Sequence, residues 1–208
     1  MHLNDLVHDV VEPRLSGLCE ELEVPGAAVM VAADDAAVTT TAGVVNTRTG
    51  VAVTPAAIFQ IQSITKVWTA TLVMQLVDEG LVDLDERVVE YLPEFRTADA
   101  SASARITVRQ LLTHSGGFEG DDWRSTTTDD TALARFVTDL VPQLPQHLPP
   151  GERFSYCSAG YGVLGRLVEV KRKLPYPAAL RHHLAQPLGI TELAVSAGEA
   201  LGHRTAIG

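Results

Sequence analysis

The chain is poor in lysine, in cysteine and in net positive charge. Only Lys66, Lys171 and Lys173 are lysines among its 208 residues, and the other basic residues are arginines. The formal net charge of -10 argues against nucleic-acid binding, because phosphate contacts need a basic surface. Cys19 and Cys157 lie far apart in the sequence and show no metal-ligand spacing. We therefore expect no disulfide, no metal and no cofactor.

Long apolar runs are also missing. No window reaches the roughly 18 apolar residues that a membrane-spanning helix needs. The N-terminal stretch MHLNDLVHDVVEPRL has no basic region followed by a long apolar run, so it does not resemble a signal peptide. These absences predict a cytoplasmic protein that does not associate with membranes. The hydrophobic fraction of 46% is ordinary for a soluble chain of this length, which suffices for one sizeable domain or two small lobes.

The first part of the chain has the pattern of a helix followed by two strands. Residues 3–22 have helical periodicity, with Pro13 as a point where the helix can kink. The runs AAVMVAAD and AAVTTTAGVV follow, and Asp34-Asp35 between them predicts a tight turn and an antiparallel hairpin. Two strands cannot bury both faces of a domain this large, so we expect further strands to be needed.

Helical patterns dominate the remainder. A helix is predicted from Ser63 to about Glu79, with Gly80 at its C-terminal end, and its apolar residues surround it almost completely. Such a helix is expected to be buried. A later helix is predicted to begin with Ser158 as its N-cap and to reach about Lys171. Shorter helical segments are expected near residues 85–92, 108–113, 131–140 and 177–185.

The stretch IQSITKVW places Ser63 one helical turn before Lys66. Residues three apart lie on the same helix face, so the hydroxyl and the amine are expected to be within hydrogen-bonding reach. An apolar setting favours the neutral amine of a lysine, which can accept a proton from a serine, whereas arginine stays protonated in proteins. The N-terminus of the helix adds a positive potential that favours a developing oxyanion. The pair therefore fits a nucleophile with its base, although an N-cap serine beside a lysine that extends to water remains an alternative.

Four stretches in a fixed order carry a more specific signal: IFQIQSITKVWTATLVMQLVDEGLVDLDERVVEYLPEF, ITVRQLLTHSGGF, PPGERFSYCSAGYGVLGRLVE and LAQPLGITEL. Together they resemble the serine β-lactamase and penicillin-recognising family, in its branch of class C β-lactamases, carboxylesterases and D-Ala-D-Ala carboxypeptidases. The resemblance covers about residues 20–208. It implies an α/β (α+β) fold, with an antiparallel sheet, flanking helices and a helical lobe. It also implies acyl transfer through a serine ester.

The resemblance assigns roles to individual residues. Ser63 would be the acylated nucleophile, Lys66 its activating partner, and Tyr156, the first residue of YCS, would help move the proton to the leaving group. Which of Lys66 and Tyr156 acts as the base stays open. Gln62 and Ser158 are expected to contact the substrate.

Two departures from the family pattern stand out. The family has asparagine where this chain has Ser158, and serine offers a shorter side chain with a single hydroxyl. The family's third motif, Lys/His-x-Gly on a late strand, is also not recognised. His114-Ser115-Gly116 follows a predicted helix, where a histidine is expected to hold a loop, and the final LGHRTAIG does not fit the motif either. The sequence is therefore interpreted as the first part of a longer fold, incomplete at its C-terminus.

The expected organisation is an N-terminal helix with the first sheet strands in residues 1–62, and the nucleophile helix with the helical lobe in residues 63–208. The late sheet strands are expected to be absent. The expected function is a serine hydrolase acting on a small-molecule ester, amide or β-lactam, with an esterase or acyl-transfer role favoured by Ser158. A non-catalytic member that binds a ligand or partner is the alternative, and a helical interaction module with a coincidental Ser–Lys pair is a second one. Exposed sheet edges favour a homo-oligomer or a completing C-terminal segment.

Overall fold

The computed structural model describes residues 2–122 and 124–203. Trp123 lies outside the described residues, as do the last five residues of LGHRTAIG. The chain divides into two units, one comprising the residues up to Ile61 together with those from Thr191 onward, and the other Gln62–Ile190. The expected division after residue 62 is one residue away from this boundary. The C-terminal segment differs, because residues from Thr191 group with the N-terminal unit rather than with the helical lobe.

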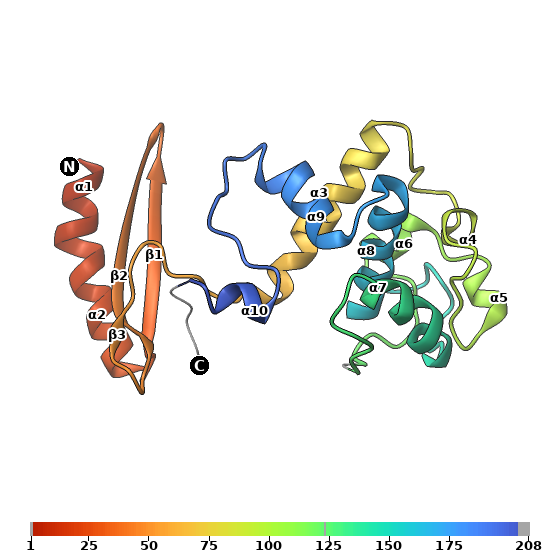
Figure 1. Cartoon of the computed structure of the whole chain (residues 1–208), viewed down its shortest axis with the longest axis horizontal. Helices are drawn as coiled ribbons and strands as arrows, with labels where there is room; N and C mark the ends of the chain where they lie inside the picture. Colours follow the sequence, from red (N-terminus) through yellow and green to blue (C-terminus); the bar gives the residue numbers. More distant parts are fainter. Residues whose placement is uncertain (1, 123, 204–208) are drawn as a thin grey trace. The chain divides into compact units, whose positions relative to one another are not determined.

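The first unit begins with one continuous helical rod beside a hairpin (Figure 1). The rod comprises α1 (Leu3–Leu6), a π-helical turn (Val7–Val11) and α2 (Glu12–Glu21). The expected kink at Pro13 is replaced by this wider turn, in which the Glu12 N–H donates to the Val7 carbonyl. Proline supplies no N–H and tolerates the first turn of a helix, so α2 starts there without interruption.

The hairpin matches the sequence prediction. Strand β1 (Gly26–Ala33) pairs antiparallel with β2 (Ala36–Asn46) around the Asp34-Asp35 turn, and the two-residue β3 (Val51–Ala52) extends the order to β1-β2-β3. Gly43 has a φ of 71°, and a Cβ there would lie 2.1 Å from the Pro25 carbonyl oxygen, so only glycine fits this position. The helical rod covers β2, and the buried side chains of this unit include Val7, Cys19, Thr40, Ala42, Val45 and Val53.

The second unit is helical. A 3-10 turn (Gln62–Ile64) leads into α3 (Thr65–Asp78), and α8 (Ser158–Arg172) packs against α3. Gly80, with a φ of 70°, follows the end of α3 as expected. The shorter elements are α4 (Val88–Tyr91), α5 (Ala100–Ser103), α6 (Val108–Leu112), α7 (Ala132–Arg135), α9 (Tyr176–Leu180), π-helical turns at Phe136–Leu140 and Arg181–Ala185, and a 3-10 turn at Val141–Gln143. The remaining helix, α10 (Ala197–Ala200), belongs to the first unit.

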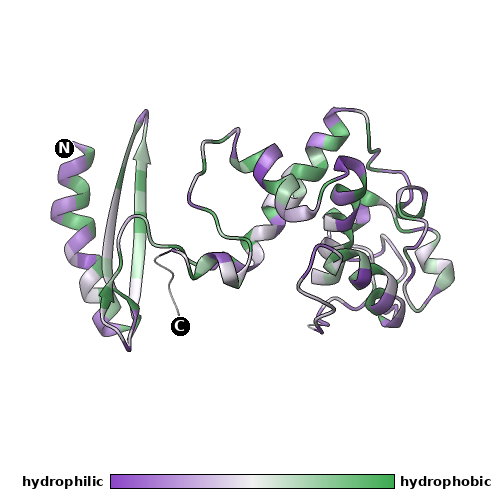
Figure 2. Cartoon of the chain, in the orientation of Figure 1, coloured by the Kyte–Doolittle hydropathy of each residue, from purple (hydrophilic) through white to green (hydrophobic). Residues whose placement is uncertain are grey.

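The packing of α3 differs from the prediction of a helix buried on all sides. Its buried face carries Thr69, Leu72, Val73 and Leu76. Val67 and Met74 lie on the other side of the same helix and are exposed. Figure 2 shows that apolar residues nevertheless occur all along α3. The α8 face that meets the core is lined by Val163, Leu164, Leu167 and Val168, all at most 1% exposed. Sequence periodicity cannot distinguish a covered apolar face from an uncovered one.

Because only one face of α3 is buried, we expect substitutions at a buried and at an exposed position of this helix to change the free energy of unfolding by different amounts. Leu72 is fully buried, so Leu72→Ala should lower the free energy of unfolding by about 2–5 kcal/mol through lost burial and the cavity that remains. Met74 is 45% exposed, so Met74→Ala should change it by no more than about 0.5 kcal/mol. Urea denaturation followed by circular dichroism measures both. Equal losses at the two positions would contradict the assigned core face.

Candidate active site

Ser63 lies in the 3-10 turn that opens the α3 helix. Gln62, directly before it, has a φ of 49°, which is an uncommon left-handed backbone conformation for a residue other than glycine. Both side chains are exposed. This geometry presents the Ser63 hydroxyl to solvent at the N-terminal end of a long helix, where a nucleophile can be reached by a substrate.

Lys66 lies one turn further along α3. Its Nζ donates a hydrogen bond to Ser63 Oγ at 3.2 Å. The Lys66 side chain is half-buried, whereas Ser63 is exposed. The predicted proximity of these two residues is therefore present in the structure.

Tyr156 reaches the same oxygen from a distant part of the sequence. It lies in the extended segment before α8, and its hydroxyl donates to Ser63 Oγ at 2.9 Å across 93 residues of sequence. The Lys66 Nζ lies 4.8 Å from the centre of the Tyr156 ring. Ser63 Oγ is thus contacted by an amine and a phenol at once, and the Tyr156 side chain remains 46% exposed.

The charge of Lys66 changes the acidity of Tyr156. The Lys66 amine, followed by the Ser63 hydroxyl, stabilises the phenolate and lowers the pKa of Tyr156, while a smaller desolvation effect opposes this. A lowered pKa raises the fraction of Tyr156 that is phenolate near neutral pH, and the phenolate is the form that can accept a proton. The three groups therefore form one connected hydrogen-bonded set.

Cys157, rather than Ser158, is the N-cap of α8. Its Sγ accepts the Gly160 N–H at 3.3 Å, and Ser158 is the first residue of the helix, so the predicted N-cap was wrong by one residue. Cysteine is an uncommon cap, which sequence patterns do not anticipate. Burial raises the pKa of the Cys157 thiol to about 11. A thiol of this kind stays protonated and serves as a packing residue.

The two expected substrate contacts differ in accessibility. Gln62 is exposed beside Ser63. The Ser158 Oγ is buried and makes no hydrogen bond of good geometry among the residues that the structure describes, although its interaction with the Tyr156 hydroxyl contributes to the lowered pKa of that phenol. A substrate contact by Ser158 therefore requires its side chain to rotate, whereas the longer amide of an asparagine would extend beyond this position.

An open hollow of about 220 Å³ adjoins the lysine. Its walls come from α3, α7, α8 and α9, and its lining consists of Thr65, Lys66, Thr69, Leu133, Tyr161, Gly162, Gly165 and Tyr176. Ser63 Oγ lies outside this lining. The hollow therefore contacts the candidate base but does not by itself mark where a scissile bond would lie.

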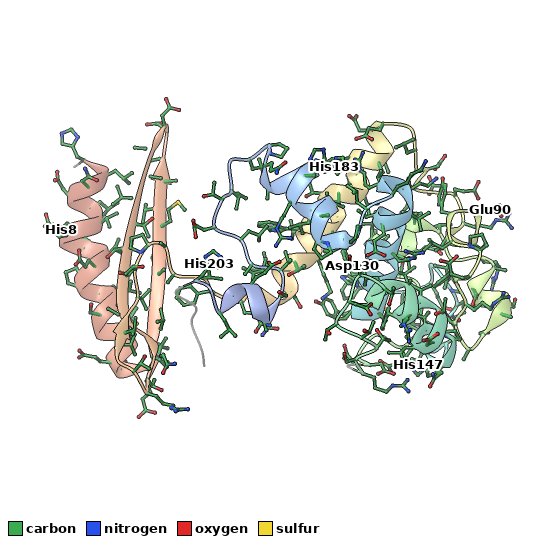
Figure 3. All side chains as sticks on the ribbon, in the orientation of Figure 1. His8, Glu90, Asp130, His147, His183 and His203 are labelled. Carbon is green, nitrogen blue, oxygen red and sulfur yellow. The ribbon has the colours of Figure 1, made fainter. Side chains whose placement is uncertain are left out.

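The histidines of the described residues do not form a second candidate site. His147 pairs with Glu119 at 3.2 Å, and Figure 3 shows His147 and His183 well separated within the helical unit. Within residues 2–122 and 124–203, no three His, Cys, Asp or Glu residues come together as metal ligands would. Cys19 and Cys157 are both free thiols. Across the same residues, no helix is long and apolar enough to cross a membrane.

Comparison with known proteins places this geometry in a family. The Beta-lactamase family model matches residues 6–208. Penicillin-binding protein 4 of Amycolatopsis lactamdurans is 44% identical over 196 residues, which cover 94% of this chain and 51% of that protein. The chain belongs to the beta-lactamase family of serine hydrolases.

Solved structures agree on the fold. The crystal structure of SurE with D-Leu has a TM-score of 0.76 at 31% identity and covers 96% of this chain and 45% of that one. The octameric penicillin-binding protein homologue from Pyrococcus abyssi has a TM-score of 0.78 at 27% identity, with 100% and 48% covered. The β-lactamase-like α/β fold expected from the sequence is thereby confirmed. The chain spans about half the length of these relatives.

The family's third motif is not carried by a strand in the described residues. Strands β1, β2 and β3 contain no Lys/His-x-Gly sequence. His114-Ser115-Gly116 lies in the loop after α6, where His114 has a φ of 56°. The described site therefore consists of the serine, the lysine and the tyrosine.

The acidity of Tyr156 provides a direct test of this arrangement. Replacing Lys66 with methionine removes the cation that stabilises the phenolate, so the pKa of Tyr156 should rise toward its ordinary value. Ultraviolet titration at the phenolate band, with the Tyr156→Phe curve subtracted, isolates this tyrosine. Lys171→Met is the matched control, because Lys171 lies over the Tyr91 ring instead. A Tyr156 titration unchanged by Lys66→Met would show that the two side chains are not coupled.

Proposed function

We propose that the chain forms an acyl-enzyme at Ser63 and acts as a serine hydrolase on an ester or amide. The observation that supports this most directly is the double contact of Ser63 Oγ, at 3.2 Å from Lys66 Nζ and 2.9 Å from the Tyr156 hydroxyl. A nucleophile and its base within hydrogen-bonding reach, with a third group orienting them, is the arrangement required for covalent catalysis. The membership of the chain in the beta-lactamase family supports the same reaction class.

The proposed first step uses only these groups. Ser63 Oγ attacks the carbonyl carbon, and its proton passes to the neutral Lys66 amine or to the Tyr156 phenolate, both of which have the required geometry. The carbonyl oxygen gains a negative charge, which the Ser63 backbone N–H at the start of the helix would stabilise. The bond to the leaving group then breaks, and that group takes back the proton. In the second step water attacks the ester carbonyl, and the proton that it loses restores the Ser63 hydroxyl.

The substrate class proposed is an ester ahead of a β-lactam or peptide. Asparagine at the third position of the YCS stretch would offer an amide donor toward the acyl side of a substrate, and Ser158 keeps its shorter hydroxyl buried. Recognition of a β-lactam or peptide depends more on such a polar contact than hydrolysis of an activated ester does. SurE was solved with D-leucine, which makes acyl groups of D-amino acids a sensible part of the substrate screen.

Covalent labelling of Ser63 is the primary test. The purified chain is incubated separately with a fluorophosphonate and with a penicillin, and the intact mass is measured. A mass increase equal to the reagent's acyl or phosphonyl group is expected on the native chain and not on Ser63→Ala. Lys66→Arg keeps the positive charge but cannot deprotonate, so it should react about 10²- to 10⁴-fold more slowly.

No mass increase with either reagent would contradict catalysis by this chain and would favour a member that binds a ligand or partner without turnover. Rapid labelling of Lys66→Arg would show instead that the lysine acts only as a charge. Circular dichroism of each variant verifies that the helical unit still folds.

Ser158→Asn tests the substrate preference. The longer amide should raise kcat/KM for a β-lactam or D-configured peptide more than for an activated ester, by about 1–3 kcal/mol in transition-state binding if one hydrogen bond is gained. The ratio of the two kcat/KM values is the quantity to measure. An equal change for both substrate types would show that this position does not discriminate between them.

A further inference from the structure

His114 holds the segment that carries Tyr156 at three points. The Ser155 N–H donates to the His114 carbonyl oxygen at 2.7 Å, and the Cys157 N–H donates to the His114 Nδ1 at 3.0 Å. Between these two bonds, the imidazole stacks on the Tyr156 ring with centres 4.5 Å apart and planes 29° from parallel. One residue after α6 thus contacts all three positions: its main-chain carbonyl holds Ser155, and its imidazole holds Cys157 and the ring of Tyr156.

The imidazole itself is held in place. The Tyr161 ring lies 5.0 Å from it, and the exposed Phe154 ring meets it edge-on at 5.7 Å. Tyr161 is anchored in turn, because its hydroxyl donates to the Leu112 carbonyl at the end of α6 at 2.9 Å. The position of His114 is therefore set by α6 and α8 together, and the Tyr156 ring rests on a supported surface.

This geometry requires a neutral imidazole. Nδ1 accepts a main-chain N–H, so the ring proton resides on Nε2, and a proton added to Nδ1 would replace the acceptor with a second donor. The titratable groups that face the ring in the described residues are Lys66 from α3, Tyr156 and Cys157 from the segment before α8, and Tyr161 from α8. None of these is a carboxylate that would stabilise an imidazolium.

The electrostatic setting agrees with the geometry. Burial, followed by the positive charge of Lys66, lowers the pKa of His114 below its ordinary value, and a smaller effect of the Cys157 backbone opposes this. A lowered folded-state pKa means that the unfolded chain binds the proton more readily. The stabilising contribution of the neutral ring is therefore fully present above the ordinary histidine pKa, and it is lost as the pH falls through the lower folded-state value.

We propose that His114 is a positioning residue that holds Tyr156 against Ser63 only while its imidazole is neutral, so that acid disengages the tyrosine from the serine. The proposal rests on the proposed roles of Ser63 and Tyr156. Protonation breaks the Cys157 N–H bond and places a second cation beside Lys66. The segment between Ser155 and Cys157 then loses its hydrogen bond at Cys157, and a shift of about 1 Å at the Tyr156 hydroxyl suffices to slow the chemical step.

Two substitutions test the two roles of the His114 side chain separately, namely hydrogen-bond acceptor and stacking ring. His114→Asn keeps an acceptor atom near the position of Nδ1, suits the left-handed backbone at a φ of 56° and does not titrate. His114→Phe keeps a stacking ring but removes the acceptor. The rate of Ser63 labelling by a fluorophosphonate is measured from pH 4 to pH 9 for both variants and for the native chain.

The native rate should fall in acid with an inflection at the pH where the His114 imidazole titrates by NMR. His114→Asn should lose this inflection and keep a rate within about threefold of native at high pH, while His114→Phe should be about 10- to 100-fold slower throughout. Retention of the acid inflection in His114→Asn, or a native rate in His114→Phe, would overturn the proposal.

An NMR titration does not depend on activity and so separates this proposal from the proposed function. In the native chain, the Cys157 amide and the Tyr156 ring signals should shift together with the His114 imidazole, and nitrogen shifts should place the proton on Nε2. If labelling never occurs but these signals shift together, the acyl-enzyme function fails while the pH-dependent anchor stands. If Cys157 and Tyr156 do not respond when His114 titrates, the anchor is refuted whatever the labelling shows.

Discussion

The packing of α8 against α3 is the contact on which the candidate site depends. Ser63 and Lys66 share α3, so their proximity is local, but Tyr156 reaches them only because α8 lies along the buried face of α3. The π-helical turn after α7 must also approach α8 closely at Gly162. A Cβ on Gly162 would lie 2.6 Å from the Phe136 ring, so a larger residue would force the π-helical turn after α7 away from α8. The apolar core of the helical unit thereby fixes a polar site on its surface.

Polar contacts at the other end of the pair reinforce this packing. The Arg172 guanidinium at the end of α8 donates two hydrogen bonds to the Glu79 carboxylate, at 2.7 and 2.8 Å. The Thr69 hydroxyl of α3 also meets the hydroxyl of Tyr176, the first residue of α9, at 2.7 Å. A bidentate pair fixes orientation as well as distance, so it limits sliding of one helix along the other. The position of the Tyr156 hydroxyl relative to Ser63 is sensitive to any such sliding, because hydrogen bonds weaken steeply with distance and angle.

The charge of Lys66, one of only three lysines in the chain, affects two neighbouring side chains of the site. Lys66 is the cation nearest the nucleophile, and its charge acts on both rings around it, making the Tyr156 phenol more acidic and the His114 imidazole less basic. Both effects favour the deprotonated form of the side chain, because each lowers a pKa. Together they favour a phenolate beside a neutral imidazole over one range of pH, which is the state in which the proposed proton transfer can occur.

Local patterns in the sequence determined the elements and part of the site. The two strand-like runs on either side of Asp34-Asp35 predicted the hairpin, and the spacing of Ser63 and Lys66 predicted their contact, because both features depend only on residues close in the sequence. The family resemblance located Tyr156, which no periodicity could have paired with a residue 93 positions away. Tertiary structure alone decided which face of α3 is covered, that Cys157 rather than Ser158 caps α8, and that the Ser158 hydroxyl is buried. It also decided that the residues from Thr191 belong with the N-terminal unit, and that His114 contacts Tyr156. These features depend on how helices distant in sequence pack, and the same local pattern is compatible with several packings.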